Sequence, residues 1–473
     1  MTHEGTTYER IEPLLPEIER CLKCGLCRGA CPVLAEVLDE SAGARGRIAL
    51  VEALREGKIE MSDLFADRLS KCLNCKSCME VCPSGIRVDE IVLAARAEIF
   101  KRGRFPFLKK LIFRNLLKRG RLLPPVSKTL AFIERRILRG LPPKSPCRVL
   151  LPLVRIDKER ILPVFAERTV MDDLAEIITP EGEPRMRVGF FLGCATNLIY
   201  TDVGKAVVRA LLGEDIEIVI PRDQGCCGMP VYSSGDLETG LALARRNISA
   251  FTEHKVDAIV TACASCGVAL KQDYEKILNL DKGSPGVLGA PVYDFGEFMD
   301  KLAGTLAAGG PRARAMGAKT RVTFHYPCHL ARGQGIKEAP RNLLRGLAGV
   351  EFVEMDEADR CCGGGGTFSL THYDISKAIG KRKVACIAAS KAELVATSCP
   401  SCMMQLGDML TQNQAPQKVV HLAELVAEHY PQLPQSAFRS ASTYNRVSKT
   451  RGRNRGSLQQ RVESKRHGKS RQP

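Results

Sequence analysis

One pattern of five cysteines occurs twice in this chain of 473 residues. The first copy consists of Cys194, Cys226, Cys227, Cys263 and Cys266. The second copy has nearly the same spacing and consists of Cys328, Cys361, Cys362, Cys399 and Cys402. Glycine follows each adjacent pair of cysteines. Because so long a spacing repeats almost to the residue, each copy is interpreted as a set of thiolates that converge on one metal site.

A different cysteine run occurs twice near the N-terminus. Both copies read C-x2-C-x2-C-x3-C-P, and they begin at Cys21 and Cys72. Bacterial ferredoxins bind two [4Fe–4S] clusters with such runs, and the fourth cysteine of each run binds the other cluster. The predicted ligand sets are Cys21, Cys24, Cys27 and Cys82 for one cluster, and Cys72, Cys75, Cys78 and Cys31 for the other. The alternative is a pair of zinc sites, although zinc uses C-x2-C units in twos.

The segment between the two ferredoxin runs is too long for a compact β-hairpin ferredoxin. Its apolar residues are spaced for a helix between Gly43 and Gly57. Residues 1–100 are therefore predicted to form an all-α ferredoxin-type domain. The polar N-terminus lacks the apolar region of a signal peptide, so the 20 cysteines are expected to be metal ligands kept reduced in the cytoplasm.

In both copies of the five-cysteine pattern, apolar runs typical of buried strands precede the cysteines. Helical patterns lie between these runs, and alternation of this kind predicts a parallel sheet. The fold class is therefore α/β, with two tandem Rossmann-like, cysteine-rich domains at residues 186–304 and 320–432, called here the first and second repeats. The cysteines are expected at the carboxyl ends of the strands, where open α/β sheets hold their ligands. Glu424 in the second repeat occupies the place of Glu297 in the first.

Two segments carry most of the net charge of +17. Residues 101–140 hold thirteen Lys and Arg against one Glu, within a predicted basic amphipathic bridge at residues 101–185. The bridge is suited to an anionic membrane surface, to packing between domains, or to an acidic partner subunit. No run of 18 apolar residues exists, so no transmembrane helix is predicted.

The C-terminal segment, residues 436–473, has eleven Lys and Arg, one Glu and almost no apolar content. It is predicted to be a disordered basic tail. The alternatives are a solvated tail without a ligand, or contact with lipid headgroups or nucleic acid. The chain has no Trp and only nine Tyr, so a surface for stacking bases, and with it a nucleic-acid partner, is not expected.

Two histidines near a cysteine are further candidate site residues. His325 and His329 flank Cys328 and are interpreted as hydrogen-bond donors to a cluster, as proton carriers, or as polar residues at a strand end. No role is assigned to Cys147 and Cys386. The chain contains no C-x-x-C-H sequence for covalent haem and no G-x-G-x-x-G after a strand for FAD or NAD. Four of the five thiolates in a repeat also suffice for a structural zinc site.

Together, the helical ferredoxin runs and the repeated five-cysteine pattern resemble the cysteine-rich CCG proteins over residues 20–430. That family includes the iron–sulfur subunits of glycolate oxidase and D-lactate dehydrogenase and the D subunit of heterodisulfide reductase. The stretches 325–333 and 361–370 look most like the glycolate and lactate group. The resemblance implies two [4Fe–4S] clusters in the ferredoxin domain, and a non-cubane [4Fe–4S] cluster in each repeat at the five cysteines named above.

The resemblance implies an oxidoreductase subunit that transfers electrons. A separate FAD-binding subunit would oxidise glycolate or D-lactate, and the electrons would leave for a quinone at the cytoplasmic face of the membrane. The alternative is a catalytic subunit like that of heterodisulfide reductase, which acts on disulfides at a non-cubane cluster. A third possibility is a metal-bound regulatory protein that uses its basic tail.

Overall fold

The computed structural model describes most of the chain in eight stretches: residues 8–103, 112–118, 123–133, 157, 159–161, 163–278, 287–305 and 319–439. The first stretch contains helices and loops and, within these residues, no strand. Its helices are η1 (Glu12–Leu14), α1 (Leu15–Glu19), α2 (Leu26–Ala30), α3 (Pro32–Val37), η2 (Glu40–Ala42), α4 (Ala44–Arg55), α5 (Asp63–Ser70), α6 (Ser77–Glu80) and α7 (Val88–Lys101). The prediction of a helical ferredoxin-type domain is confirmed, and α4 is the helix predicted between Gly43 and Gly57.

The first repeat is built on a five-stranded sheet with the order β1-β3-β2-β4-β5. Its strands are β1 (Ile177–Ile178), β2 (Met186–Phe191), β3 (Ile216–Val219), β4 (Ala258–Thr261) and β5 (Val292–Asp294). Strands β2 to β5 are parallel, as predicted. The unpredicted β1 pairs with β3 in the antiparallel direction. The helices of this repeat are α12 (Gly193–Leu198), α13 (Thr201–Leu212), α14 (Met229–Tyr232), α15 (Leu237–Thr252), α16 (Ala264–Val268), the π-helix η6 (Ala269–Asp273), α17 (Tyr274–Leu278) and α18 (Phe295–Thr305).

The second repeat has a four-stranded sheet with the order β7-β6-β8-β9, and all its strands are parallel. The strands are β6 (Thr320–Phe324), β7 (Val350–Phe352), β8 (Leu394–Thr397) and β9 (Lys418–His421). The helices are α19 (Cys328–Ala331), α20 (Glu338–Gly346), α21 (Phe368–Thr371), α22 (Tyr373–Ala389), α23 (Pro400–Gln412), α24 (Leu422–Ala427) and η7 (Gln435–Ala437). As predicted, each cysteine or cysteine pair of a repeat follows the carboxyl end of a strand.

The two repeats pack on each other through equivalent elements. Helix α13 of the first repeat contacts α24 of the second, and α18 of the first contacts α20 of the second in return. Nearer the cysteines, α12 contacts α23 and α16 contacts α19. Helices α13 and α18 of the first repeat are equivalent to α20 and α24 of the second, so the first two contacts are the same contact with the repeats exchanged. The same holds for the second two contacts, and this is the arrangement of a two-fold interface. This pseudo-two-fold packing brings the cysteine-bearing ends of the two sheets together.

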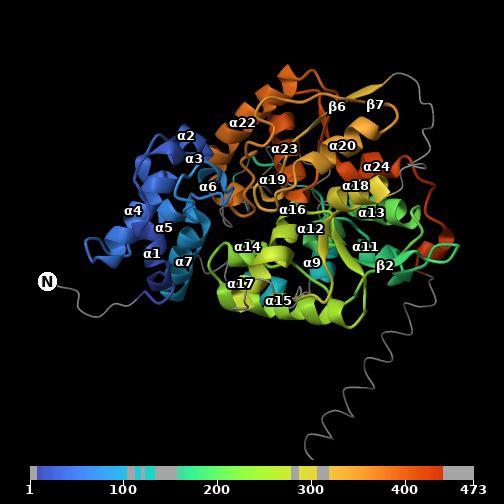
Figure 1. The fold of residues 1–473 in the computed structure, drawn as a ribbon, viewed down its shortest axis with the longest axis horizontal. Helices are drawn as coiled ribbons and strands as arrows, with labels where there is room; N and C mark the ends of the chain where they lie inside the picture. Colours follow the sequence, from blue (N-terminus) through green and yellow to red (C-terminus); the bar gives the residue numbers. More distant parts are fainter. Residues whose placement is uncertain are drawn as a thin grey trace, which may run out of the picture.

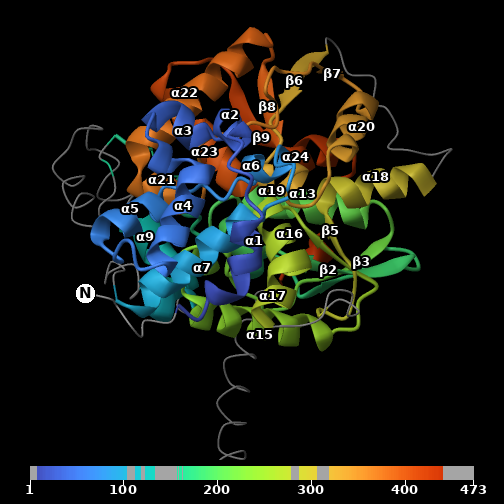
Figure 2. The same cartoon turned by 60° about the vertical axis from the view of Figure 1, so that its left-hand side comes forward.

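The ferredoxin helices lie against the junction of the two repeats. In Figure 1 they lie beside both repeats. In Figure 2 they lie in front of the boundary between the first and the second repeat. Leu73 and Cys75 share an apolar cluster with Cys361 and Phe368 of the second repeat. On the side of the first repeat, Arg96 donates to the carbonyl of Ser233 (2.8 Å). The three cysteine-rich parts therefore form one packed body.

The described parts of the predicted bridge contact the first and second repeats. They include η3 (Ile112–Leu117), α9 (Leu123–Ile133) and α11 (Val170–Asp173). Arg114 pairs with Glu238 (3.3 Å), and Leu117 packs against Val231 and Leu243 of the first repeat. This is packing between parts of the protein, which was one of the predicted alternatives. The remainder of the predicted amphipathic segment lies outside the described residues.

The beginning of the predicted tail packs against the fold. The backbone N–H of Ala175 donates to Ala437 (2.9 Å), and that of Arg439 donates to Asp173 (2.8 Å). The prediction that the disordered tail begins at residue 436 is therefore wrong for residues 436–439, because this segment is bonded to residues 173–175 just before β1. Residues 440–473 and Cys147 lie outside the described residues. None of the helices in the described stretches has both the length and the apolar character needed to cross a membrane.

Candidate iron–sulfur sites

Two cavities in the ferredoxin domain are lined by the two predicted ligand sets. We call them site A and site B. Site A is lined by Cys21, Cys24, Cys27 and Cys82. Site B is lined by Cys31, Cys72, Cys75 and Cys78. In both cavities the fourth thiol comes from the other run, which is the exchange that the sequence predicted.

Local structure fixes the cysteines of sites A and B. Pro32 is the first residue of α3, where its missing N–H costs no hydrogen bond, so the chain turns directly after Cys31. Backbone N–H groups point at the sulfurs: Asn74 donates to Cys72 (3.4 Å) and Ile86 to Cys82 (3.4 Å). Donors of this kind stabilise charge on cluster sulfur and help to set the potential.

The ten cysteines of the two repeats form one continuous series of neighbouring thiols, which we call the thiol row. In order, the row runs Cys194, Cys226, Cys227, Cys266, Cys263, Cys399, Cys402, Cys362, Cys361, Cys328. Each thiol lies close enough to the next to shift its pKa. The first five belong to the first repeat and the last five to the second. Sequence analysis predicted the two sets of five but not that Cys263 and Cys399 join them.

Proton sharing perturbs the thiol pKa values along the row. Hydrogen bonds from Cys226 and Cys266 lower the pKa of Cys227 to about 5. Hydrogen bonds from Cys361 and Cys402 likewise place the pKa of Cys362 well below its usual value. The donor Cys402 shows the opposite effect, since its bonds to Cys362 and Cys399 raise its pKa strongly. Without a bound cation the row cannot ionise fully, whereas metal binding requires every thiol to lose its proton.

The donor set fits iron–sulfur clusters. All nineteen described cysteines are free thiols, and eighteen of them lie in sites A and B or in the thiol row. Burial raises the pKa of Cys75 to about 12, with a further contribution from Cys328. Packing so many thiolates together is unfavourable unless a cationic group neutralises them, and iron–sulfur clusters are held by thiolates of this kind.

Glycine permits the turn after each adjacent cysteine pair. Gly228 and Gly363 both have a φ of +88°, in the region that other residues rarely adopt. A Cβ on Gly363 would lie 2.7 Å from the carbonyl oxygen of Ser376. The N–H of Gly228 donates to the sulfur of Cys226 (3.5 Å). The glycines therefore allow the backbone to approach the thiols, as the sequence suggested.

His329 links three of the sites. One ring nitrogen bonds to the carbonyl of Asn74 in site B (3.2 Å), and the other to the hydroxyl of Ser265 in the first repeat (3.1 Å). Because the carbonyl can only accept, Nε2 carries the proton, and Nδ1 accepts from Ser265. Burial lowers the pKa of His329, which agrees with a neutral ring. His329 thus connects the loop around Cys328 to the loops that carry Asn74 and Ser265.

A matching pair of helix caps, which was not predicted from the sequence, lies next to the thiol row. Asp294 accepts from the N–H of Gly296 (2.9 Å), and His421 accepts from the N–H of Ala423 (3.1 Å). The equivalent residues Glu297 and Glu424 complete these caps by accepting from the N–H groups of Asp294 (3.4 Å) and His421 (2.7 Å). His421 also donates from Nε2 to the carbonyl of Ala262 in the first repeat (3.0 Å). The only sequence signal for this role was the equivalence of Glu297 and Glu424.

A pH dependence of stability follows from His421. Burial lowers its pKa from 6.5 to about 4. As the pH falls, His421 therefore binds a proton in the unfolded chain before it does so in the folded protein. The contribution of neutral His421 to the free energy of unfolding is complete above pH 6.5 and is lost as the pH falls towards 4. This contribution amounts to about 3 kcal/mol. Asn is a good cap without a titrating ring. Between pH 7 and 4, the urea midpoint of the unaltered protein should therefore fall more than that of His421→Asn. Parallel curves would contradict this assignment.

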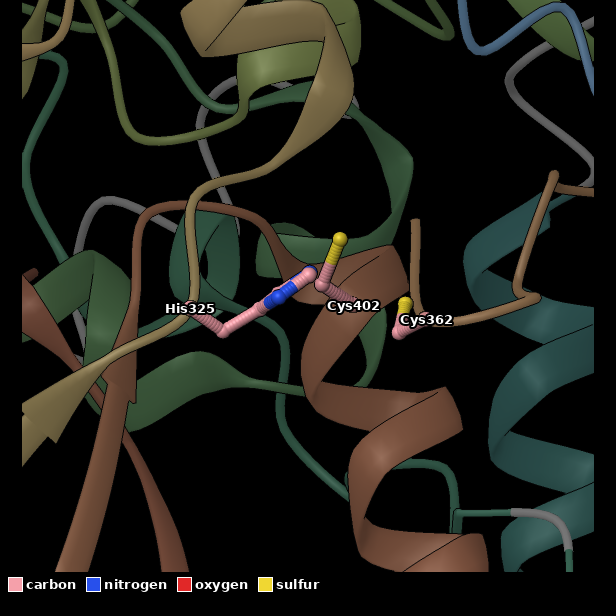
Figure 3. Close-up of side chains that lie close together, drawn as sticks. All are labelled: His325, Cys362 and Cys402. Carbon is pink, nitrogen blue, oxygen red and sulfur yellow. The ribbon is translucent and has the colours of Figure 1, made fainter. Parts of the chain in front are cut away.

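The imidazole of His325 lies beside two thiols of the second repeat. Figure 3 shows the ring extending from the end of β6 towards Cys402 at the start of α23, with Cys362 on a neighbouring loop. One ring nitrogen and the two sulfurs lie within 4.8 Å of one another. His325 is fully buried.

Cys386, to which no role was assigned, is half-buried on α22 and packs against the core.

Known protein families match the parts of the chain that carry these sites. A "4Fe-4S dicluster domain" model matches residues 17–86. A "Cysteine-rich domain" model, CCG, matches twice, at residues 188–271 and 322–407. The matched ranges contain the two ferredoxin runs and both five-cysteine patterns. Iron–sulfur binding by this chain therefore agrees with its geometry and with its family.

Three relatives illustrate the range of the family. "Probable glycolate oxidase iron-sulfur subunit" of Bacillus subtilis is 30% identical over 87% of this chain and 94% of its own length. One of the subunits of "Fumarate reductase (CoM/CoB)" of Methanothermobacter marburgensis is 28% identical over 90% and 76%. "Lactate utilization protein A" of Oceanobacillus iheyensis is 32% identical over 52% and 98%. This chain belongs to the CCG-domain iron–sulfur proteins, the family of the glycolate oxidase iron–sulfur subunits.

Proposed function

We propose that this chain is the electron-transfer subunit of an FAD-linked 2-hydroxy-acid dehydrogenase that acts on glycolate or D-lactate and delivers electrons to a quinone. The partner would be a separate FAD-binding subunit. The names of the glycolate and lactate relatives support this substrate class. We further propose that the parts at residues 1–100, 186–304 and 320–432 hold the cofactors, that residues 101–185 bridge them, and that the basic regions contact the partner or the membrane surface.

The observation that carries the proposal is the linear order of the cysteine sites. Sites A and B are adjacent in the ferredoxin domain, and Cys78 lines both cavities. Cys75 of site B lies close enough to Cys328 for their charges to interact. From Cys328 the thiol row leads through the second repeat to Cys194 in the first. Iron–sulfur clusters bound there would supply one-electron carriers, and this order supports passage of electrons between two separate partners.

The protein supplies the insulation and the fixed spacing that such a series requires. Cys263 and Cys399 are buried, with 7% and 1% of their surface exposed, so the junction of the two repeats is shielded from water. The N–H of Ala264 donates to the carbonyl of Ser398 (3.2 Å), which holds the two loops together. We propose two [4Fe–4S] clusters at sites A and B and one non-cubane [4Fe–4S] cluster in each repeat, because each repeat has five thiols rather than four.

The second candidate is a catalytic subunit that reduces disulfides, as in heterodisulfide reductase. The relative named for CoM/CoB fumarate reductase favours it, and so does the fifth thiol of each repeat. In that case, disulfide would reoxidise the reduced protein directly. In the first case, reoxidation would need a quinone.

Electron delivery through the partner distinguishes the two functions. The full chain would be co-purified with the proposed FAD-binding subunit, and glycolate or D-lactate added without oxygen. The proposed function predicts that the hydroxy acid bleaches the iron–sulfur absorbance and that a soluble quinone restores it within one turnover. Restoration by a disulfide but not by the quinone would favour the second candidate. If neither hydroxy acid bleaches the absorbance, the proposed dehydrogenase role is wrong.

A further inference from the structure

The two repeats differ at one position that faces the thiols. His325 lies three residues before Cys328, and Phe191 lies three residues before Cys194. Both lie at the carboxyl end of the central strand: Phe191 is the last residue of β2 and is paired with Thr261 of β4. His325 directly follows β6, and its N–H donates to Ala396 of β8 (2.9 Å). The fold thus places a phenyl ring in the first repeat where it places an imidazole in the second.

Phe191 has an ordinary role in the core of the first repeat. It is fully buried, and its ring centroid lies 5.8 Å from that of Phe251. A Cβ on Gly193 would lie 3.6 Å from the Phe191 ring and 2.9 Å from the sulfur of Cys266. The ring edge is therefore near Cys266, which is the counterpart of Cys402. Phe191 brings no donor atom to that place.

His325 does not have the bonding expected of a histidine in a protein core. Its side chain is fully buried, yet neither ring nitrogen has a nitrogen or oxygen partner within the described residues. The ring does interact with the sulfur of Cys362, and a buried ring whose polar neighbours are thiols alone calls for an explanation. The groups beside it are Cys362 and Cys402, whose sulfurs lie with one ring nitrogen inside 4.8 Å (Figure 3).

We propose that His325 binds iron of the cluster in the second repeat through a ring nitrogen, as a sixth protein donor that the first repeat lacks. The inference rests on the proposed clusters and extends them. Imidazole is a regular iron ligand, and in two-iron clusters the replacement of thiolate by histidine raises the potential. A neutral donor in one repeat alone makes the two cofactors unequal, with the higher potential in the second repeat, next to site B.

Nitrogen hyperfine coupling tests the assignment in the unaltered protein. The chain would be labelled with ¹⁵N-histidine and purified without oxygen. The redox potential of the sample would then be set so that the cluster of the second repeat is paramagnetic. Pulsed EPR is expected to show coupling to one histidine nitrogen of the size found for a metal ligand. Absence of that coupling from a sample with full iron content would overturn the assignment. Low iron content in the same sample would instead contradict the proposed clusters themselves, and with them the proposed function.

Two reciprocal variants provide matched controls. His325→Phe installs the residue of the first repeat and is expected to abolish the nitrogen coupling and shift one midpoint potential to a more negative value. Phe191→His makes the opposite change and is expected to add coupling in the first repeat. An unchanged potential in His325→Phe at full iron content would contradict the proposal. His325→Leu serves the same purpose if the phenyl ring is too large to be accommodated.

Discussion

Replacement of Cys362 by alanine is expected to lower the iron content by about four atoms per chain, the content of one [4Fe–4S] cluster. Cys362 lies in the middle of the second repeat's part of the thiol row, where it contacts Cys361 and Cys402. Without it, sites A and B should no longer exchange electrons with the first repeat on the time scale of turnover.

Cys386→Ala is the matched control, since Cys386 is also a cysteine of the second repeat but lies on α22 outside the thiol row. Its iron content and reduction kinetics should equal those of the unaltered protein. Iron analysis and EPR spin counting measure both variants. Full iron content in Cys362→Ala would show that the second repeat does not use this thiol, and equal losses in both variants would indicate a general defect of folding.

The second large effect concerns a buried ion pair that fastens the bridge to the second repeat. Arg160 donates to Asp408 (3.2 Å) and to Gln405 (2.9 Å), and the two charged side chains are 1% and 0% exposed. Arg160→Met leaves Asp408 buried without its cation, which costs about 3–5 kcal/mol. We expect the midpoint of thermal unfolding to fall by roughly 3–5 °C.

A neighbouring pair supplies the control. Glu159 and Lys377 connect the same segment to the same repeat (2.8 Å), but both are about half exposed. Exposed pairs contribute about 0–1 kcal/mol, so Lys377→Met should leave the midpoint nearly unchanged. The double variant Arg160→Met, Asp408→Asn should recover much of the loss, because no charge is left unpaired and the amide oxygen can still accept from Ile161 and Tyr373. An equal effect of Arg160→Met and Lys377→Met would contradict the ion-pair argument.

The sequence predicted those features that depend on local pattern. Spacing alone gave the exchange of Cys31 and Cys82 between the ferredoxin runs, because their short loops leave few other geometries. Apolar runs before the cysteines gave the parallel strands, since buried parallel strands are continuously apolar. The glycines at 228 and 363 were recognised as positions of close approach, and both have positive φ.

Features that depend on packing between distant segments were not predictable. The contact of Cys263 with Cys399 exists because two sheets pack about a pseudo-two-fold axis, and neither repeat contains that information alone. The burial of Arg160 could not be predicted, because an arginine in a charged stretch is ordinarily expected to be exposed. The pairing of β1 and of residues 437–439 involves short segments without periodicity.

Metal analysis tests the central claim most directly. Protein purified without oxygen, with its full chain, would be assayed for iron, acid-labile sulfide and zinc. Two clusters in the ferredoxin domain and one in each repeat predict about 16 iron atoms per chain and no stoichiometric zinc. About 8 iron atoms together with stoichiometric zinc would contradict the account, because the two repeats would then hold structural zinc and could not carry electrons.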